Sequence, residues 1–310
     1  MTKLATNPLT GVQFCISAGD YSATVTELGA GLREFHCRDQ PVIVGYAADD
    51  LPPGAAGQLL APWPNRIDGG KYSIGGATYQ LDLSEPTVGN AIHGLTRWAG
   101  WQPAAQADDM VQLTHVLHGR PGYPFRLELT AQYRLSATEG LQVSITASND
   151  GSRPAPYGTG SHPYLSAGTA LVDQCQLALP AARWLPTDER GIPHGQPEDV
   201  TGTPYDFREP RAIGDTRLDH ALTGLVFGED GRAWAWLSGA RTKVGLWAGR
   251  GYRWLQVFTG DTLDPARRRR AIAVEPMTSP PNAFASGTDL LILQPGDSIT
   301  HTWGITVAHS

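Results

Sequence analysis

Hydrophobic and polar residues alternate with a period of two along much of the chain. From Leu127 to Leu135 every second residue is apolar, and the same alternation returns from Leu141 to Ala147 after a short polar stretch. Successive side chains of a β-strand point to opposite faces of a sheet, so this pattern predicts strands with one buried and one solvent-facing side. The two segments are therefore expected to form an antiparallel hairpin with its turn at residues 138–140.

A second hairpin is predicted over residues 72–81. Gly75 and Gly76 lie at its centre, and glycine supplies the positive φ angles that a tight hairpin turn needs. Period-two alternation also predicts four further strands, at residues 234–237, 244–248, 254–258 and 299–307.

The chain has no long amphipathic helical pattern. The best helical candidate, residues 265–270, is too short to form a stable helix. Strands recur about every ten residues and are separated by turns rich in Gly (36) and Pro (24). This organisation predicts an all-β sandwich. Residues 181–215, rich in Pro, Gly and charge, are interpreted as a long surface excursion, so that residues 1–310 form a single domain.

Composition and charge narrow the range of partners. The net charge of −6 leaves no broad basic surface for nucleic acid. The one basic run, residues 267–270, is interpreted as a solvated loop between two strands. Three widely spaced cysteines form neither a metal motif nor a disulfide framework, which favours reduced thiols. There is no signal-peptide pattern and no apolar stretch of bilayer length, so we expect a cytoplasmic protein without a membrane partner.

Six polar residues stand in short and unusual local contexts that are spread over more than 200 positions. They are Arg66 in Ala-Pro-Trp-Pro-Asn-Arg-Ile, His93 in Asn-Ala-Ile-His-Gly, His162 in Gly-Ser-His-Pro-Tyr, Asp219 in Arg-Leu-Asp-His, Gln256 in Leu-Gln-Val-Phe-Thr-Gly-Asp and Glu275 in Ala-Val-Glu-Pro. These contexts, in this order, resemble the aldose 1-epimerase family, the galactose mutarotases. The resemblance runs from about Glu27 to the C-terminus.

The resemblance implies both a fold and an activity. The implied fold is a large twisted antiparallel β-sandwich, the galactose mutarotase-like supersandwich, with a sugar cleft on its concave face. The implied activity interconverts the α and β anomers of a free aldose, with the sugar as the small-molecule partner and with no cofactor and no metal. In this reaction a base takes the proton of the C1 hydroxyl while an acid protonates the ring oxygen, each contributing about 10²–10⁴-fold.

Glu275 and His162 are the expected catalytic pair. Glu275 ends the apolar run 271–274, which predicts a buried strand that Pro276 stops, and partial burial there makes the carboxylate a better base. His162 is the expected acid, because a nearby carboxylate would enlarge its protonated fraction. The hypothesis requires these two groups to meet at opposite sides of one hemiacetal.

The remaining matched residues are expected to bind the sugar. A guanidinium and a carboxylate can each form two bonds to neighbouring hydroxyl groups, which suits Arg66 and Asp219. Gln256 can offer its amide to the sugar or to Glu275. His93 and Asn65 complete the group. Aromatic rings cover the apolar faces of sugars, and one or two of four neighbouring aromatics are expected to do so: Trp63, Trp98, Trp101 and Tyr164.

Other chemistries fit the sequence poorly. His115 and His118, three residues apart on a predicted strand, point to opposite faces and do not suit one metal ion. The glycines of residues 54–57 lack the Lys-Ser/Thr of a phosphate loop. Ser161 and His162 are adjacent, but the Gly-x-Ser-x-Gly element of a hydrolase is absent.

Two alternatives remain open. Epimerisation of a hexose 6-phosphate would need basic residues at the cleft rim, for which Arg33, Arg97 and Arg253 are candidates. A non-catalytic sugar-binding module on the same scaffold could lack the acid or base, whereas this chain retains both. Three positions depart from the usual family pattern: Ser161, Met277 and Asn282 replace Asn, Gln and Asp. The sugar itself and the oligomeric state stay open.

Overall fold

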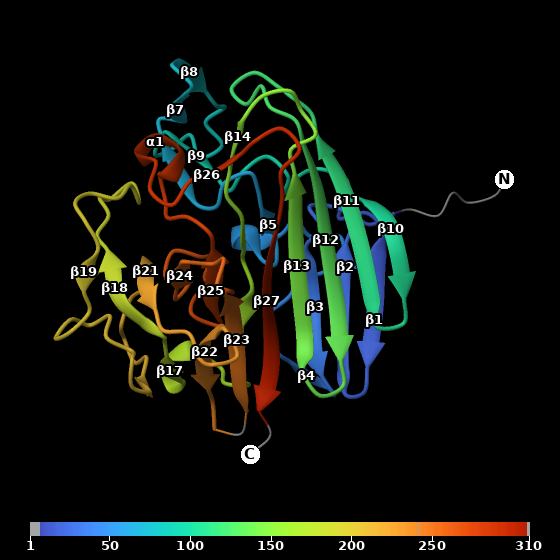
Figure 1. The fold of residues 1–310 in the computed structure, drawn as a ribbon. Helices are drawn as coiled ribbons and strands as arrows, with labels where there is room; N and C mark the ends of the chain where they lie inside the picture. Colours follow the sequence, from blue (N-terminus) through green and yellow to red (C-terminus); the bar gives the residue numbers. More distant parts are fainter. Residues whose placement is uncertain (1–6, 241, 309–310) are drawn as a thin grey trace.

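A computed structural model describes residues 7–240 and 242–308 of the chain (Figure 1). Within these residues the structure is almost entirely β, with antiparallel sheets. The four-residue α1 (Ala283–Ser286) is the α-helix of this part of the chain, and two 3₁₀ turns lie at Pro53–Ala55 and Val172–Gln174. The all-β class predicted from the alternation is therefore confirmed.

Two of the sheets form opposite layers at one end of the molecule. A nine-stranded sheet has the order β10 (Gln102–Ala107), β11 (Met110–Leu117), β12 (Leu127–Ser136), β13 (Gly140–Ser148), β27 (Ser298–Ala308), β23 (Lys243–Gly249), β22 (Arg232–Ser238), β17 (Gln176–Ala178) and β20 (Arg211–Ala212). A four-stranded sheet joins β1 (Gln13–Ala18), β2 (Tyr21–Thr26), β3 (Leu32–Cys37) and β4 (Gln40–Pro41). Strands β1 and β2 pack behind β11 and β12, as the blue and green arrows of Figure 1 show.

An eight-stranded sheet lies beside them. Its order is β19 (Glu198–Asp199), β18 (Ala181–Leu185), β21 (Asp219–Leu225), β24 (Trp254–Phe258), β25 (Ile272–Met277), β15 (Gly160–Ser161) and β5 (Leu59–Leu60), with β16 (Tyr164–Leu165) also paired to β25. Three two-stranded ribbons complete the fold: β14 (Ala155–Tyr157) with β26 (Leu291–Leu293), β6 (Arg66–Asp68) with β9 (Asn90–Ile92), and β7 (Lys71–Ile74) with β8 (Ala77–Gln80).

Both predicted hairpins form. Leu135 pairs with Leu141 across the β12–β13 turn, and Ile74 pairs with Ala77 across the two glycines of the β7–β8 turn. The alternation also places the apolar side chains inside, since Leu129 and Val143 are fully buried. Both hairpin predictions are confirmed, as are the four strands now numbered β22, β23, β24 and β27.

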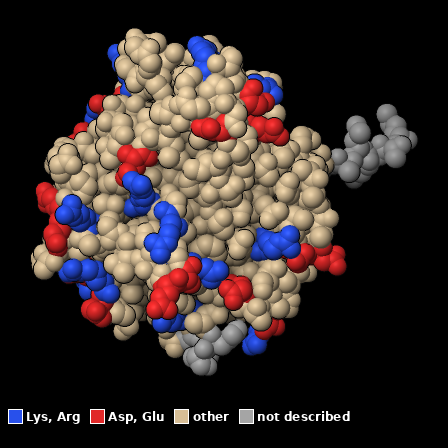
Figure 2. Space-filling model, viewed as in Figure 1, with Lys and Arg blue, Asp and Glu red and all other residues tan. Residues whose placement is uncertain are grey.

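The outer face of the nine-stranded sheet carries few charges around β13 and β27. Hydroxyl groups pair across these strands, at 3.3 Å for Ser144 with Thr302 and 2.8 Å for Thr146 with Thr300. In Figure 2 this area is the broad tan surface, and basic and acidic residues are interspersed around it. The face in this view therefore presents no extended basic area.

Residues 265–270 form turns, in agreement with the judgement that they are too short for a stable helix. Two other expectations about elements are wrong. Residues 181–215 are not only a surface excursion, because they contribute β18 and β19 to the eight-stranded sheet. The basic run is a loop, as predicted, but it is not fully solvated: the Arg269 side chain is 12% exposed and pairs with Asp173 and Asp261 at 2.7 and 2.9 Å. No helix in the described ranges is both long and apolar enough to span a bilayer.

Candidate active site

One pocket collects every candidate residue that the sequence contexts identify. It has a volume of about 330 Å³ and lies over β24 and β25, beside the β6–β9 ribbon. The sequence-predicted residues in its lining are Asn65, Arg66, His93, His162, Asp219, Gln256 and Glu275. Seven side chains that lie up to 210 positions apart, from Asn65 to Glu275, therefore face one space.

Glu275 lies within β25, not at its end. The strand continues through Pro276 to Met277, so the expectation that Pro276 stops the strand is wrong. One edge of β25 has interrupted partners, because β16 pairs with Ala273 and β15 pairs with Met277. The missing N–H of Pro276 therefore breaks no continuous ladder on that edge. Glu275 is 2% exposed, far more deeply buried than a strand terminus would be.

His162 is held beside this carboxylate by its backbone and by aromatic neighbours. Its N–H donates to the Gln58 carbonyl at 3.1 Å, and its ring stacks on Tyr164 with 5.0 Å between centroids. His162 Nε2 lies 3.2 Å from Glu275 Oε1. The two groups thus converge on one pocket, but they contact each other directly instead of facing each other across it. Glu275 Oε2 and His162 Nδ1 have no hydrogen-bond partner within the described residues.

Burial controls the ionisation of this pair. It raises the pKa of Glu275 well above its usual range, with the charge of Asp219 adding to the rise and Arg66 opposing it. Burial also lowers the pKa of His162 to about 3, and the charge of Arg97 contributes to that lowering. Burial therefore opposes the protonated fraction of His162 that was expected from a nearby carboxylate. Both shifts favour the uncharged forms of the two groups, so that the pair shares one proton, carried by the carboxyl group.

Glu275→Gln should therefore stabilise the fold in a pH-dependent way. Because the folded pKa exceeds the unfolded one, the contribution of Glu275 to stability is fully present below about pH 4.3 and is lost as the pH rises through the folded pKa. We expect similar Tm values for both proteins at pH 4.5 and a higher Tm for the variant at pH 8, by about 1.5 °C for each kcal/mol gained. Calorimetric scans across pH, with the exposed Glu139→Gln as control, test this. A constant Tm difference across pH would contradict it.

Asn65 and His93 fix each other at the entrance of the β6–β9 ribbon. Both have positive φ angles, 55° and 62°, which non-glycine residues rarely adopt. The Asn65 N–H donates to His93 Nδ1 at 3.3 Å, and the His93 N–H donates to the Asn65 carbonyl at 2.9 Å. Burial and the nearby His162 lower the pKa of His93, so its imidazole is neutral. Because Nδ1 accepts, the proton of the neutral ring resides on Nε2, which makes His93 a hydrogen-bond donor.

Arg66 is held in a bidentate ion pair. Its Nε and Nη2 donate to the two carboxylate oxygens of Glu85, each at 2.8 Å. Asn282 bonds to the backbone of β6 at two points, since its N–H donates to the Arg66 carbonyl and its Oδ1 accepts from the Asp68 N–H at 3.0 Å. Asn282, which departs from the usual family pattern, therefore contacts the backbone of Arg66. Glu85 thus engages two of the three guanidinium nitrogens, Nε and Nη2.

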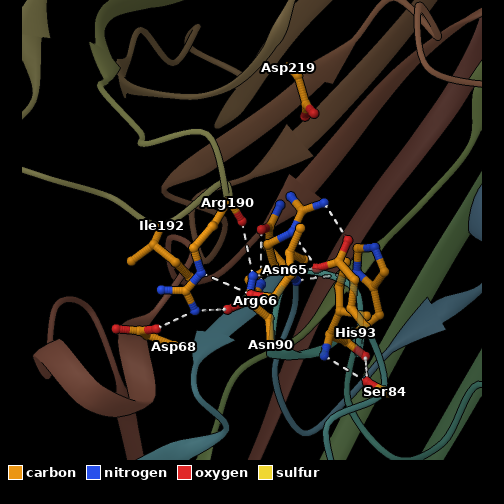
Figure 3. Close-up of polar contacts among 12 residues, drawn as sticks. Asn65, Arg66, Asp68, Ser84, Asn90, His93, Arg190, Ile192 and Asp219 are labelled. Atoms are coloured by element: carbon orange, nitrogen blue, oxygen red, sulfur yellow. Dashed lines mark hydrogen bonds and ion pairs between the residues drawn. The ribbon is translucent and has the colours of Figure 1, made fainter.

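Asp219 and Gln256 form the opposite wall. Gln256 Nε2 donates to Asp219 Oδ1 at 2.7 Å, so its amide bonds to Asp219 and not to Glu275, although Gln256 and Glu275 are register partners. Gln256 Oε1 has no partner in the described protein. The surrounding protein raises the pKa of Asp219, while Arg66 and the Gln256 amide oppose the rise. Figure 3 shows Asp219 standing apart from the Arg66 network.

Sequence reasoning missed or misjudged some of the lining. Glu85 has no distinctive local context, and only its pairing with Arg66 makes it part of the site. Of the four aromatic candidates, Tyr164 alone lines the pocket, together with the unanticipated Phe258. Trp63 and Trp101 are buried in the core, and Trp98 is 49% exposed. In the described ranges no group of three or more His, Cys, Asp or Glu side chains is placed to hold a metal.

The chain resembles members of one protein family along nearly its whole length. The family model described as aldose 1-epimerase matches residues 13–306. The chain is 36% identical to the uncharacterized protein YihR of Escherichia coli K12 over 287 residues, which cover 92% of this chain and 90% of YihR. It is 30% identical over 208 residues to the aldose 1-epimerase of the same strain, covering 64% of this chain and 58% of that enzyme.

Comparison with solved structures shows the same similarity for the fold. A crystal structure of an aldose epimerase homologue from C. elegans superimposes with a TM-score of 0.86 at 18% identity, covering 96% of this chain and 99% of that one. The protein belongs to the aldose 1-epimerase family, as the sequence contexts indicated. The galactose mutarotase-like sandwich expected from the resemblance is confirmed.

Proposed function

We propose that the protein is an aldose 1-epimerase that interconverts the α and β anomers of a free aldose. The observation that carries this proposal is the buried contact between Glu275 and His162, 3.2 Å apart, in a polar pocket. Groups at this distance can reach two oxygens bound to one carbon. The C1 hydroxyl and the ring oxygen O5 of an aldopyranose are such a pair, because both are attached to C1.

The single proton of the pair suffices for the reaction. Its transfer from Glu275 to His162 creates a carboxylate base and an imidazolium acid. Glu275 then takes the proton of the C1 hydroxyl, the C1–O5 bond breaks as the carbonyl forms, and His162 protonates O5. The aldehyde turns about C1–C2 and the ring recloses with the two roles exchanged. Acid and base thus return to their first states without a cofactor or a metal.

The other pocket residues are assigned to substrate positioning. The Arg66 guanidinium and the Asp219 carboxylate bind sugar hydroxyls, and the unpartnered Gln256 Oε1 accepts from another. His93 donates from Nε2. Asn65 acts by holding the His93 ring, because its N–H occupies Nδ1. Tyr164, whose hydroxyl is fixed by the Gly54 carbonyl at 2.9 Å, offers an aromatic wall to the sugar.

The proposal predicts faster decay of optical rotation. Fresh α-D-glucose or α-D-galactose should relax to the anomeric equilibrium severalfold faster with catalytic amounts of protein than in buffer, in a polarimeter at pH 7. An unchanged rate with every common aldose, together with calorimetric evidence of sugar binding, would favour the non-catalytic binding module instead. The retained Glu275 and His162 favour the enzyme.

One observation favours an anionic sugar as a second candidate substrate. Arg97 lines the pocket, lies over the Trp98 ring at 5.2 Å, and has no carboxylate partner within the described residues. The other candidates for phosphate binding are engaged elsewhere: Arg33 pairs with Glu34 and Arg253 pairs with Asp289. If Arg97 binds a phosphate, Arg97→Gln should lower kcat/KM for glucose 6-phosphate about tenfold or more and leave that for glucose nearly unchanged. Equal effects on both sugars would reject this candidate.

Two further expectations remain part of the proposal. The three cysteines are unpaired, which supports a reducing compartment and hence the cytoplasm. The main cluster of buried side chains draws on both ends of the described chain, from Phe14 to Ile305, which supports a single domain.

A further inference from the structure

A loop in the β18–β19 connection packs against Arg66, which lines the pocket. It spans residues 186–194 and is called here the 186–194 loop. Its ends meet, since Thr187 bridges Pro193 and the His194 N–H donates to the Pro186 carbonyl at 3.0 Å. Inside it, Asp188 Oδ1 accepts the N–H groups of two residues of the loop tip at 2.9 Å each. The loop is therefore a compact, internally bonded unit.

Arg190 ties this loop to the β6–β9 ribbon (Figure 3). Its Nη2 donates to Asp68 Oδ1 at 2.7 Å and to Asn90 Oδ1 at 2.9 Å, and its Nε donates to the Val88 carbonyl at 2.9 Å. Asn90, which is fully buried, returns a bond from Nδ2 to the Arg190 carbonyl at 2.9 Å. One side chain thus bonds to β6, to β9 and to the turn that presents Glu85.

Held by these bonds, the 186–194 loop packs its backbone against Arg66. Gly191 has a φ of +73°, and a Cβ added to it would lie 2.6 Å from Arg66 Nη1 and 3.1 Å from Arg66 Cζ. Glu85 holds the other two nitrogens of the guanidinium. Arg66 is therefore confined between a carboxylate on one side and a glycine backbone on the other.

We propose that the 186–194 loop positions Arg66 for sugar binding and that the bonds of Arg190 hold the loop in place. Arg190 and Gly191 are thus positioning residues, which set the affinity for the sugar and leave the proton transfers of Glu275 and His162 untouched. The sugar-binding part of this inference rests on the proposed function, whereas the confinement of Arg66 can be tested without any substrate.

The substrate-free test compares two glycines of the same region. Gly195 has almost the same φ as Gly191, +75°, but nothing lies within 4 Å of the position of its Cβ. Both Gly→Ala variants bear the same backbone strain. The Tm should therefore fall further in Gly191→Ala than in Gly195→Ala, and the difference should come from the contact with Arg66. In an Arg66→Ala background this extra loss should disappear. An extra loss that persists without the guanidinium, or no extra loss at all, overturns the confinement.

The functional test separates binding from chemistry. Gly191→Ala and Arg190→Gln should raise KM for the aldose about tenfold, as expected for a weakened hydrogen bond to a charged group, with kcat and its pH profile retained. Gly195→Ala and Arg208→Gln are the matched controls; the Arg208 side chain is 41% exposed, as is that of Arg190, and pairs with Asp206 at 2.7 Å. A loss confined to kcat, or equal effects in the controls, overturns the positioning role. If the wild type does not accelerate mutarotation, the proposed function fails, and calorimetric titration with D-galactose replaces KM.

Discussion

Glu275→Gln is expected to lower kcat for mutarotation by about 10²–10⁴-fold, which is the contribution of one positioned acid or base. An amide of the same size can neither take the proton of the C1 hydroxyl nor supply the one proton that the Glu275–His162 pair holds. Sugar affinity should stay within a few-fold, because the groups assigned to the hydroxyls, including Arg66 and Asp219, are unchanged. Polarimetry gives kcat, and calorimetric titration of the same variant gives the affinity.

The control for this variant is Glu139→Gln, which removes an exposed carboxylate from an ion pair with Arg232 outside the pocket. It should behave as the wild type in both measurements. Near-normal turnover by Glu275→Gln would remove this carboxylate from the mechanism. A joint loss of turnover and sugar affinity would instead indicate damage to the pocket as a whole.

His162→Asn is expected to reduce kcat by a similar factor, about 10²–10⁴-fold, and to change the pH dependence. In the wild type kcat/KM should fall at alkaline pH, as the last proton of the pair leaves with the raised pKa of Glu275. It should also fall at acidic pH, where His162, with a pKa of about 3, takes up a second proton. Activity therefore extends further into acid than an ordinary histidine would allow.

The pH profile of the variant decides the role of the imidazole. Without His162 the acid limb should follow only the carboxyl group, so residual activity should rise with pH instead of falling at the alkaline end. Stopped-flow polarimetry between pH 3 and pH 10 gives both profiles. A wild-type profile without an alkaline fall, in an assay limited by chemistry, would contradict the one-proton pair.

The parts of the fold that follow from the sequence are those with local causes. The β12–β13 hairpin is predictable because alternation and a Gly-containing turn lie within about twenty neighbouring residues. The two-residue strands β5 and β15 are too short to show such a pattern. They form because the fold brings these segments beside each other and beside β25. The strand through Pro276 was missed for the same reason: whether a proline is tolerated depends on gaps between distant partners.

The candidate site likewise has a part that the sequence predicts and a part that only the fold determines. The local contexts identified seven residues of the pocket lining, because together they resemble those of one protein family. The ionisation of the pair could not be predicted locally, since the low pKa of His162 depends on how deeply the whole fold buries it. Glu85 and Arg190 likewise carry no motif. Their importance arises from bonds to Arg66 and Asn90 that join segments far apart in sequence.

The position of β27 has a consequence for how the protein is made. Among the residues that the structure describes, this strand, Ser298–Ala308, lies between β13 and β23 and alone links the β10–β13 block to the β23–β22 block in that sheet. Each block can form before β27 has been synthesised, but the two blocks then lack the strand that pairs with both. We therefore expect the sheet to close only after its last strand is synthesised, as a late step that depends on contacts between distant parts of the chain.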